Sequence, residues 1–214
     1  MKPMRLSKFL RTLLLATAML VAGGAHSQST AAAPDAMVRD LSNEVLNAIK
    51  ADKALTSGDT VRVQKLVDEK ILPYVDFQKM TQLAVGRGWR QATPEQRAAL
   101  TREFRTLLVR TYSGALSQVK DHQVQMRPFR AQPNDSDVMV RTSIVASRGD
   151  PIQLDYRLEK TDAGWKIYDV NILGVWLVEN YKSQFASEIN ANGIDGLIKS
   201  LTERNRQLDG TKKA

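Results

Sequence analysis

The chain of 214 residues contains no cysteine and two histidines. Without cysteine it can form neither a disulfide framework nor a thiolate nucleophile. His26 lies in the N-terminal leader described below, which leaves His122 as the remaining imidazole. A metal site built on His122 would need carboxylates at ligand spacing, and the sequence offers none. We therefore expect no metal and no cofactor.

The familiar motifs of enzyme active sites are missing as well. There is no G-x-S-x-G, no glycine-rich phosphate loop and no H-E-x-x-H. Asp76 and Asp169 are acids embedded in apolar runs, and we interpret them as capping or hydrogen-bonded structural groups. His122 is interpreted as an exposed residue at the start of a strand. The sequence thus favours a protein that is not an enzyme.

The first 27 residues are typical of a secretory signal peptide. A basic region precedes the stretch 12–22, which is apolar apart from two threonines, and small residues follow over 23–27. Cleavage after Ala25 or after Ser27 fits this pattern equally well. The apolar stretch is too short to span a bilayer comfortably. We expect an exported chain, cleaved near residues 25–27.

The positive charge of the chain is modest once the leader is set aside. The formal net charge of the whole sequence is +8. Four lysines and arginines belong to the leader, so residues 28–214 carry 27 Lys and Arg against 23 Asp and Glu. The basic residues are interspersed with acidic ones, unlike the basic patch of a nucleic-acid-binding protein. We expect no nucleic-acid partner.

Apolar residues recur at helical spacing over the first part of the exported chain. Helical patterns run from Pro34 to Ile49, from Val61 to Ile71 and from Val75 to Val85. The clearest helix start is Thr93-Pro94-Glu95-Gln96, in which Thr93 and Gln96 can form a capping box. An apolar stripe from Leu100 to Leu116 follows it.

The apolar period then changes from 3.6 residues to two, which predicts strands. We predict four strands, over residues 122–130, 137–148, 152–158 and 165–173. Helices follow over 175–191 and 195–208, with a break at Asn192-Gly193. The predicted fold is α+β: a four-stranded antiparallel meander with one apolar face covered by several helices. We expect one domain over residues 34–208 and a flexible tail over 209–214.

Four segments resemble the MlaC, or toluene-tolerance, family. The longest is L-P-Y-V-D-F-x-x-M-x-x-L-A-V-G-x-x-W-R-x-A-T-P-E-Q-R, residues 72–97, followed by E-F-R-x-L-L-V-R-T-Y-x-x-A-L at 103–116. The others are W-K-I-Y-D-V-x-x-x-G-V-x-L-V-x-N-Y at 165–181 and N-G-I-D-G-L at 192–197. Trp176 and Lys182 depart from the residues that are common in the family.

The resemblance implies a soluble periplasmic phospholipid carrier that maintains the lipid asymmetry of the outer membrane. We expect the exported chain to be a monomer, because its strongly apolar segment is removed with the leader. Its implied partners are an outer-membrane lipoprotein–porin complex and an inner-membrane ABC transporter with an MCE-domain protein. Two acyl chains with about 30 methylenes represent roughly 20 kcal/mol of unfavourable hydration. Both chains therefore need an enclosed apolar cavity, which we expect between the sheet and the helices.

The predicted site residues follow from this arrangement. The predicted lipid-binding residues are Tyr74, Val75, Phe77, Met80, Leu83, Leu108, Tyr112, Val124, Met126, Val138, Val140, Ile144, Leu154, Tyr156, Leu158, Val170, Ile172, Val175 and Val178. Arg97, Arg148 and Arg157 are predicted contacts for a lipid head group or a partner, although each is also an ordinary solvated residue. Each apolar residue taken singly also fits an ordinary core.

Two regions carry sharper predictions. In the third predicted strand the apolar parity should face the cavity and the polar parity should face water. The apolar set is Ile152, Leu154, Tyr156 and Leu158; the polar set is Gln153, Asp155 and Arg157. The uncharged segment Val170–Val178 should line the cavity where the last strand meets a helix, with Val175 and Val178 on one helical face.

Two other functions remain open at this point. A lipid hydrolase or acyltransferase would need a Ser–His pair that includes His122. An adaptor without a ligand would have a filled core, in which the predicted lipid-binding residues pack against one another.

Overall fold

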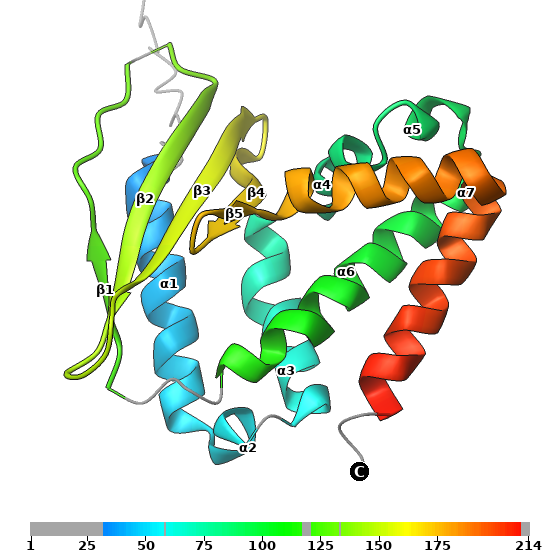
Figure 1. Cartoon of the computed structure of the whole chain (residues 1–214). Coiled ribbons are helices and arrows are strands. Elements are labelled where there is room, and N and C mark those ends of the chain that lie inside the picture. Colours follow the sequence, from blue (N-terminus) through cyan, green and yellow to red (C-terminus); the bar gives the residue numbers. More distant parts are fainter. Residues whose placement is uncertain (1–31, 58, 117–120, 133, 211–214) are drawn as a thin grey trace, which may run out of the picture. The chain divides into compact units, whose positions relative to one another are not determined.

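In the part of the chain that the structure describes, short and long helices come first, a sheet follows, and one more helix follows the sheet (Figure 1). The computed structural model describes residues 32–57, 59–116, 121–132 and 134–210. The predicted leader and residues 211–214 of the predicted tail lie outside the described residues. The first elements are α1 (Pro34–Ala51), α2 (Lys53–Thr56), α3 (Thr60–Leu66), the π-helical turn η1 (Val67–Ile71), the 3-10 turn η2 (Leu72–Tyr74), α4 (Phe77–Val85), α5 (Gly88–Gln91) and α6 (Pro94–Leu116). The later elements are β1 (Gln123–Met126), β2 (Asp137–Val145), β3 (Ile152–Thr161), β4 (Gly164–Ile172), β5 (Val175–Trp176) and α7 (Leu177–Gly210).

Short polar side chains cap the helices where the sequence predicted it. The Gln96 N–H donates to Thr93 Oγ1 (3.2 Å) and the Thr93 N–H donates to Gln96 Oε1 (3.0 Å), which completes the capping box of α6. Asp59 caps α3 by accepting from the N–H groups of its first turn. Asp76 caps α4 by accepting from the Lys79 N–H (2.8 Å), so its structural interpretation is confirmed.

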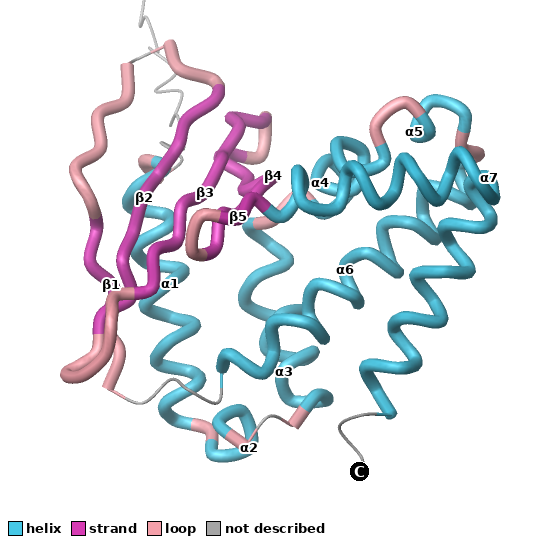
Figure 2. The backbone as a smooth tube through the Cα atoms, viewed as in Figure 1, coloured by secondary structure: helices cyan, strands magenta, loops and turns pink. Residues whose placement is uncertain are grey.

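The sheet is an antiparallel meander in the order β1-β2-β3-β4-β5 (Figure 2). The predicted fold class is confirmed, but the sheet has five strands rather than four. Val175 and Trp176, predicted to begin a helix, form β5 and pair with Ile172 and Asn171. A strand of two residues is too short to show a period, so the sequence pattern could not predict it.

A β-bulge decides which side chains of β4 share a face. Leu158 lies opposite Ile167, whereas Tyr156 lies opposite Val170. The register shifts between Arg157 and Leu158, which leaves one extra residue on β4. Ile167 and Val170 therefore lie on the same face, although their numbers differ in parity. Val75, in the segment before α4, forms a parallel bridge with Ile167 of β4, beyond the part of β4 that pairs with β5.

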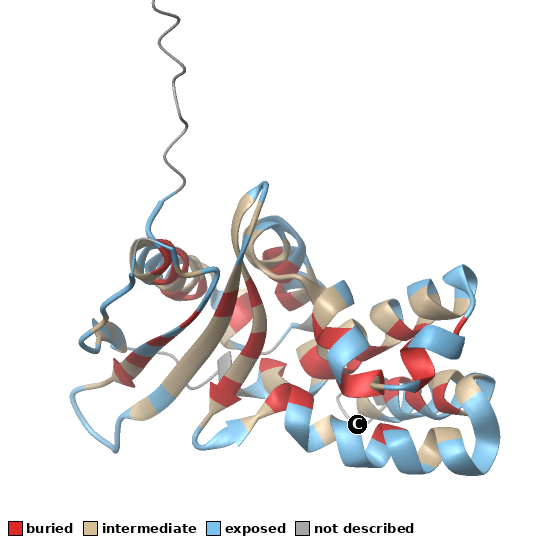
Figure 3. Cartoon of the chain, turned by 90° about the horizontal axis from the view of Figure 1, so that it is seen from above, coloured by how far each residue is buried: buried red, intermediate tan, exposed pale blue. Residues whose placement is uncertain are grey.

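The helix after the sheet changes direction where a break was predicted. Gly193 inside α7 has φ 72° and ψ −175°, which is not helical. Figure 1 shows the two parts of α7 meeting at a sharp angle there. The described residues belong to one compact unit. Along β2 and β4, buried side chains alternate with partly buried or exposed ones (Figure 3).

Candidate functional site

Two separate groups of helices cover the apolar face of the sheet. α1 packs on it through Met37, Val38 and Leu41, which form a buried cluster with four sheet residues. These four are Val138, Val140, Leu158 and Ile167. Helices α4 to α7 form a second buried cluster, against which Val170 and Ile172 pack while they stay partly exposed.

The buried apolar residues form three clusters, which partly buried side chains connect. A third cluster joins α1 to α3 through Ile49 and Val63. Val75 and Val170 border both the first and the second cluster, and Val45 borders the first and the third. All three bordering side chains are partly buried. These connecting side chains therefore keep some accessible apolar surface where the clusters meet.

The structure separates the predicted lining residues into three groups. The fully buried residues belong to the core: Met80, Leu108, Val138, Val140, Ile144, Leu158 and Val178. The partly buried residues retain accessible surface: Tyr74, Val75, Phe77, Tyr112, Val124, Met126, Leu154, Tyr156, Val170 and Ile172. Leu83 and Val175 are 37% and 47% exposed. Leu83 borders a shallow groove with polar neighbours.

The partly buried set contains a contiguous patch on the sheet. Leu154 lies directly opposite Ile172, and Tyr156 lies directly opposite Val170. Thr142, the buried polar residue of this face, donates through Oγ1 to the Leu154 carbonyl (3.1 Å). Burial raises the pKa of the Tyr156 phenol. The patch therefore presents hydrocarbon and the phenol of Tyr156, without a charged side chain.

Asp169 joins the sheet to α7 on the opposite face. Its carboxylate accepts from the N–H groups of Val170 (2.9 Å) and Val178 (3.0 Å) and from Arg157 Nη1 (3.2 Å). The side chain of Asp169 is 1% exposed. Burial raises its pKa, while the two backbone hydrogen bonds and Arg157 act in the other direction. The predicted structural role of Asp169 is confirmed.

The three predicted arginine contacts lie in different places. Arg157 lies on the face that was expected to meet water, with 43% of its side chain exposed, and there it pairs with buried Asp169 and stacks on Trp176, with 3.9 Å between its guanidinium carbon and the ring centroid. The bulge on β4 brings Asp169 opposite Arg157, a pairing that the sequence did not predict. Arg148 lies exposed between β2 and β3. Arg97 lines a groove described below.

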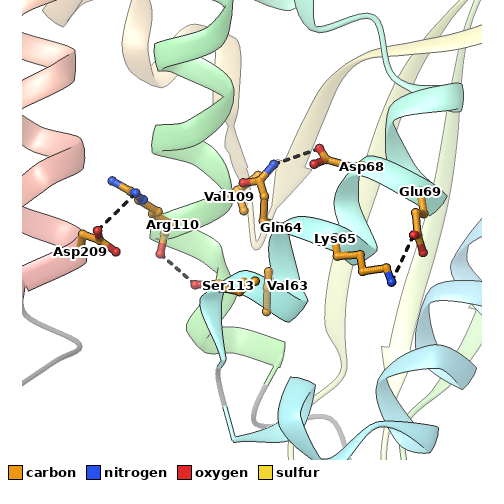
Figure 4. Close-up of a pocket in the computed structure, with 10 residues that line it drawn as sticks. Val63, Gln64, Lys65, Asp68, Glu69, Val109, Arg110, Ser113 and Asp209 are labelled. Carbon is orange, nitrogen blue, oxygen red and sulfur yellow. Dashed lines mark hydrogen bonds and ion pairs between the residues drawn. The ribbon is translucent and has the colours of Figure 1, made fainter.

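One open groove lies between α3, α6 and the end of α7, and its charged groups pair with one another (Figure 4). Its volume is about 670 Å³ and its apolar wall includes Val63 and Val109. Lys65 lies 3.7 Å from Glu69, and Arg110 lies 3.6 Å from Asp209. These charges of the groove are thus balanced locally.

A second groove, between the first half of α6 and the α4–α5 segment, is one-sided in charge. Its volume is about 660 Å³ and its lining includes Arg97, Arg102 and Arg105. Among the described residues that line it there is no carboxylate. Its apolar lining comprises Leu72, Phe77, Trp89, Pro94 and Ala98. The sequence pattern could not show that α4 and α5 face these arginines.

The arginines of this groove differ in how firmly they are held. Arg97 donates from Nε to the Trp89 carbonyl (2.9 Å) and lies over the Trp89 ring. Arg105 Nη2 lies 3.3 Å from Asp68. Arg102 is exposed and pairs with its neighbour Glu103. We call this lining the arginine groove.

The described residues show no metal site and no membrane-spanning helix. No group of three or more His, Asp or Glu side chains in this part of the chain could hold a metal ion. None of the described helices is long and apolar enough to cross a bilayer. His122 directly precedes β1, as predicted, but it is half-buried rather than exposed. Its carbonyl accepts from Lys50 Nζ (2.6 Å).

A family model described as "MlaC protein" matches residues 39–203. This chain belongs to the MlaC family. The resemblance seen in the sequence motifs is thereby confirmed.

Curated relatives and a solved structure agree with the family. An intermembrane phospholipid transport system binding protein MlaC from Haemophilus influenzae is 23% identical, over 87% of each chain. A toluene tolerance protein from Pseudomonas putida is 24% identical, over 85% of this chain and 86% of that protein. The structure of a phospholipid-binding protein from Ralstonia solanacearum, in complex with a phospholipid, is 47% identical with a TM-score of 0.80. It covers 83% of this chain and 99% of its own.

Proposed function

We propose that this chain is a phospholipid carrier of the periplasm. The observation that carries the proposal is the likeness to the phospholipid-bound R. solanacearum structure, at 47% identity and a TM-score of 0.80. The H. influenzae relative is named for phospholipid transport between membranes, which supports the same activity. A carrier of this kind is not an enzyme, and the neutral, uncharged patch on β3 and β4 suits binding better than catalysis.

We propose that the acyl chains lie against the partly buried sheet residues. Leu154, Tyr156, Val170 and Ile172 form one patch by their cross-strand pairing. Tyr112 and Val75 border the helical cluster beside it. Hydrocarbon that the chain leaves accessible at the margins of its clusters gains roughly 25 cal/mol per Å² when a lipid tail covers it. This accessible hydrocarbon is therefore a physical reason for a bound lipid.

The finer parts of the function rest on the family. We propose that the chain is exported through its leader and works as a monomer. It would exchange lipid with an outer-membrane lipoprotein–porin complex and with an inner-membrane MCE-domain protein and its ABC transporter, which maintains outer-membrane asymmetry. We propose that the arginine groove receives an acidic segment of such a partner, because its lining offers cations and an apolar floor, which are features of binding interfaces.

The lipid site is tested by matched substitutions on the two faces of β3. Leu154→Asp places a charge on the proposed acyl surface, whereas Gln153→Asp places the same group on the exposed face. Native mass spectrometry of the purified proteins should show phospholipid on the wild type and on Gln153→Asp, and none on Leu154→Asp.

A fold control accompanies this comparison. Circular dichroism should show folded Leu154→Asp, and the milder Leu154→Asn serves if the charged variant does not fold. Wild-type protein without phospholipid would contradict the carrier function. Equal lipid content in both aspartate variants would contradict the proposed position of the acyl chains.

A further inference from the structure

The turn between β4 and β5 holds a leucine in a conformation that leucine disfavours. Leu173 has φ 51° and Gly174 has φ 91°. Positive φ at both residues of a two-residue hairpin loop is the pattern of a type I′ turn, which favours asparagine, aspartate and glycine. In this region the Cβ of other residues crowds the backbone. Among the described residues, Leu173 is the non-glycine residue with positive φ.

Packing inside the chain does not compensate for this conformation. The side chain of Leu173 is 65% exposed, and that of Val175, two residues later, is 47% exposed. Polar contacts hold the backbone instead: the Leu173 N–H donates to the Gln153 carbonyl (3.1 Å), and the Gly174 N–H donates to Asn171 Oδ1 (2.8 Å). An asparagine at position 173 could keep both contacts without the exposed hydrocarbon.

The turn continues the apolar surface of the sheet. Val175 lies opposite Ile172, so its side chain lies on the same face as the patch formed with Val170. The whole segment Val170–Val178 carries no charge. Such a surface offers nothing that would attract a charged protein partner, and its chemistry is complementary to hydrocarbon. Backbone strain that packing within the chain does not offset tends to occur at functional sites.

We propose that Leu173 and Val175 form the rim of the lipid site and contact the acyl chains of a phospholipid as it passes between a bilayer and the carrier. This inference rests on the proposed function, and it assigns to the turn a role in loading rather than in holding the lipid. The leucine is retained in a disfavoured conformation because an exposed apolar side chain is needed at this position.

The experiment pairs stability with lipid uptake in Leu173→Asn. Vesicles of phosphatidylethanolamine and phosphatidylglycerol that contain a fluorescent phospholipid serve as donors for lipid-free protein. Asparagine tolerates positive φ, so the Tm of the lipid-free variant should rise by about 2–4 °C. Its uptake rate should fall roughly tenfold, because the contact of one leucine with hydrocarbon is lost. A substitution that stabilises the fold and slows uptake is not explained by a structural role.

Two controls define the result. Leu173→Met keeps the conformation and the apolar surface, so its Tm and uptake rate should match the wild type. Val61→Asn makes the same change at a side chain that is 76% exposed on α3, and it should not alter the uptake rate. Unchanged uptake by Leu173→Asn, or a lower Tm of that variant, would overturn the proposal that Leu173 and Val175 form the rim of the lipid site.

Two further outcomes separate the possible errors. If uptake from vesicles is unchanged and only transfer from a purified membrane partner falls, the turn contacts protein and the proposal is overturned. If the wild type takes up no lipid at all, the proposed carrier function is wrong, and so is the proposed role of Leu173 and Val175.

Discussion

At the scale of single residues, the polar face of the sheet depends on one buried carboxylate. Asp169 accepts two backbone N–H groups, one of them from the first turn of α7, and pairs with Arg157. Removing one partner of a buried charge leaves the other without compensation. Arg157 also covers Trp176, so its loss would expose the ring as well.

We expect Arg157→Ala to lower the free energy of unfolding by about 1–3 kcal/mol, the cost of leaving a buried hydrogen-bonding group unsatisfied. Urea unfolding monitored by tryptophan fluorescence measures the change. Arg148→Ala is the matched control, since Arg148 is exposed in the β2–β3 connection, and it should change stability by no more than about 0.5 kcal/mol. Equal effects of the two substitutions would contradict a structural role for Arg157.

The sequence could predict the role of Asp169 but not the identity of its partner. An acid inside an apolar run must be hydrogen-bonded if it is buried, whatever the fold. Strict alternation places Arg157 on the solvated face, which is correct, and says nothing about a carboxylate that a bulge brings opposite it. The head-group role predicted for Arg157 stays a prediction, now weakened by these two contacts.

At the scale of elements, glycine conformations decide how the helices and strands are connected. Gly193 lies in a region of φ and ψ that is almost exclusive to glycine. The second part of α7, which carries Leu197 and Leu201 into the cluster with α6, depends on the change of direction there. A continuous helix would carry these leucines away from their neighbours.

We expect Gly193→Ala to reduce the free energy of unfolding by about 1–3 kcal/mol, the usual cost of a disfavoured backbone conformation. An added Cβ at Gly193 meets no atom within 4 Å, so the effect would come from the backbone alone. Gly114→Ala, in helical α6, adds a Cβ that likewise meets no side chain or distant backbone atom within 4 Å, and it should instead stabilise the fold by about 0.5–1 kcal/mol. Thermal unfolding of both variants tests the contrast in sign.

Elements with a long period were predictable, and their ends were less so. The capping box of α6, the break in α7 and the meander order follow from local patterns that tertiary contacts reinforce. β5 was missed because its two residues look like the first turn of the helix that follows. The prediction that Val175 and Val178 share a helical face was therefore wrong, since Val175 lies in β5 and Val178 in α7.

At the scale of the whole described unit, the buried apolar residues form three clusters, and three arginines line one groove. Periodicity predicted which residues are apolar and inward-facing, but it could not separate core from cavity. That separation depends on the distance between packed layers, which no local pattern encodes. The same limit applies to the arginine groove, whose lining comes from α4, α5 and α6 together.

From the arginines that line the arginine groove we predict an electrostatic association with a membrane partner. Arg102→Glu should lower the association rate with the purified MCE-domain protein several-fold at low salt, because exposed charges steer encounter. The difference should vanish near 1 M salt, where screening acts over about 3 Å. Arg206→Glu, at an exposed arginine of α7, is the control and should associate like the wild type. A reduction that persists at high salt, or none at all, would contradict docking at this groove.

The outer strands of the sheet decide how readily copies of this protein could aggregate by strand pairing. β1, at one border, has four residues, and β5, at the other, has two, while the strands of nine and ten residues lie between them. The Asp76 N–H donates to the Ile167 carbonyl (2.8 Å), so the stretch of β4 beyond β5 is partly occupied by the chain itself. Long free strand edges are the usual template for aggregation between copies. The short outer strands and the bond to Ile167 thus limit the free strand edge that another copy could extend, which disfavours fibre formation.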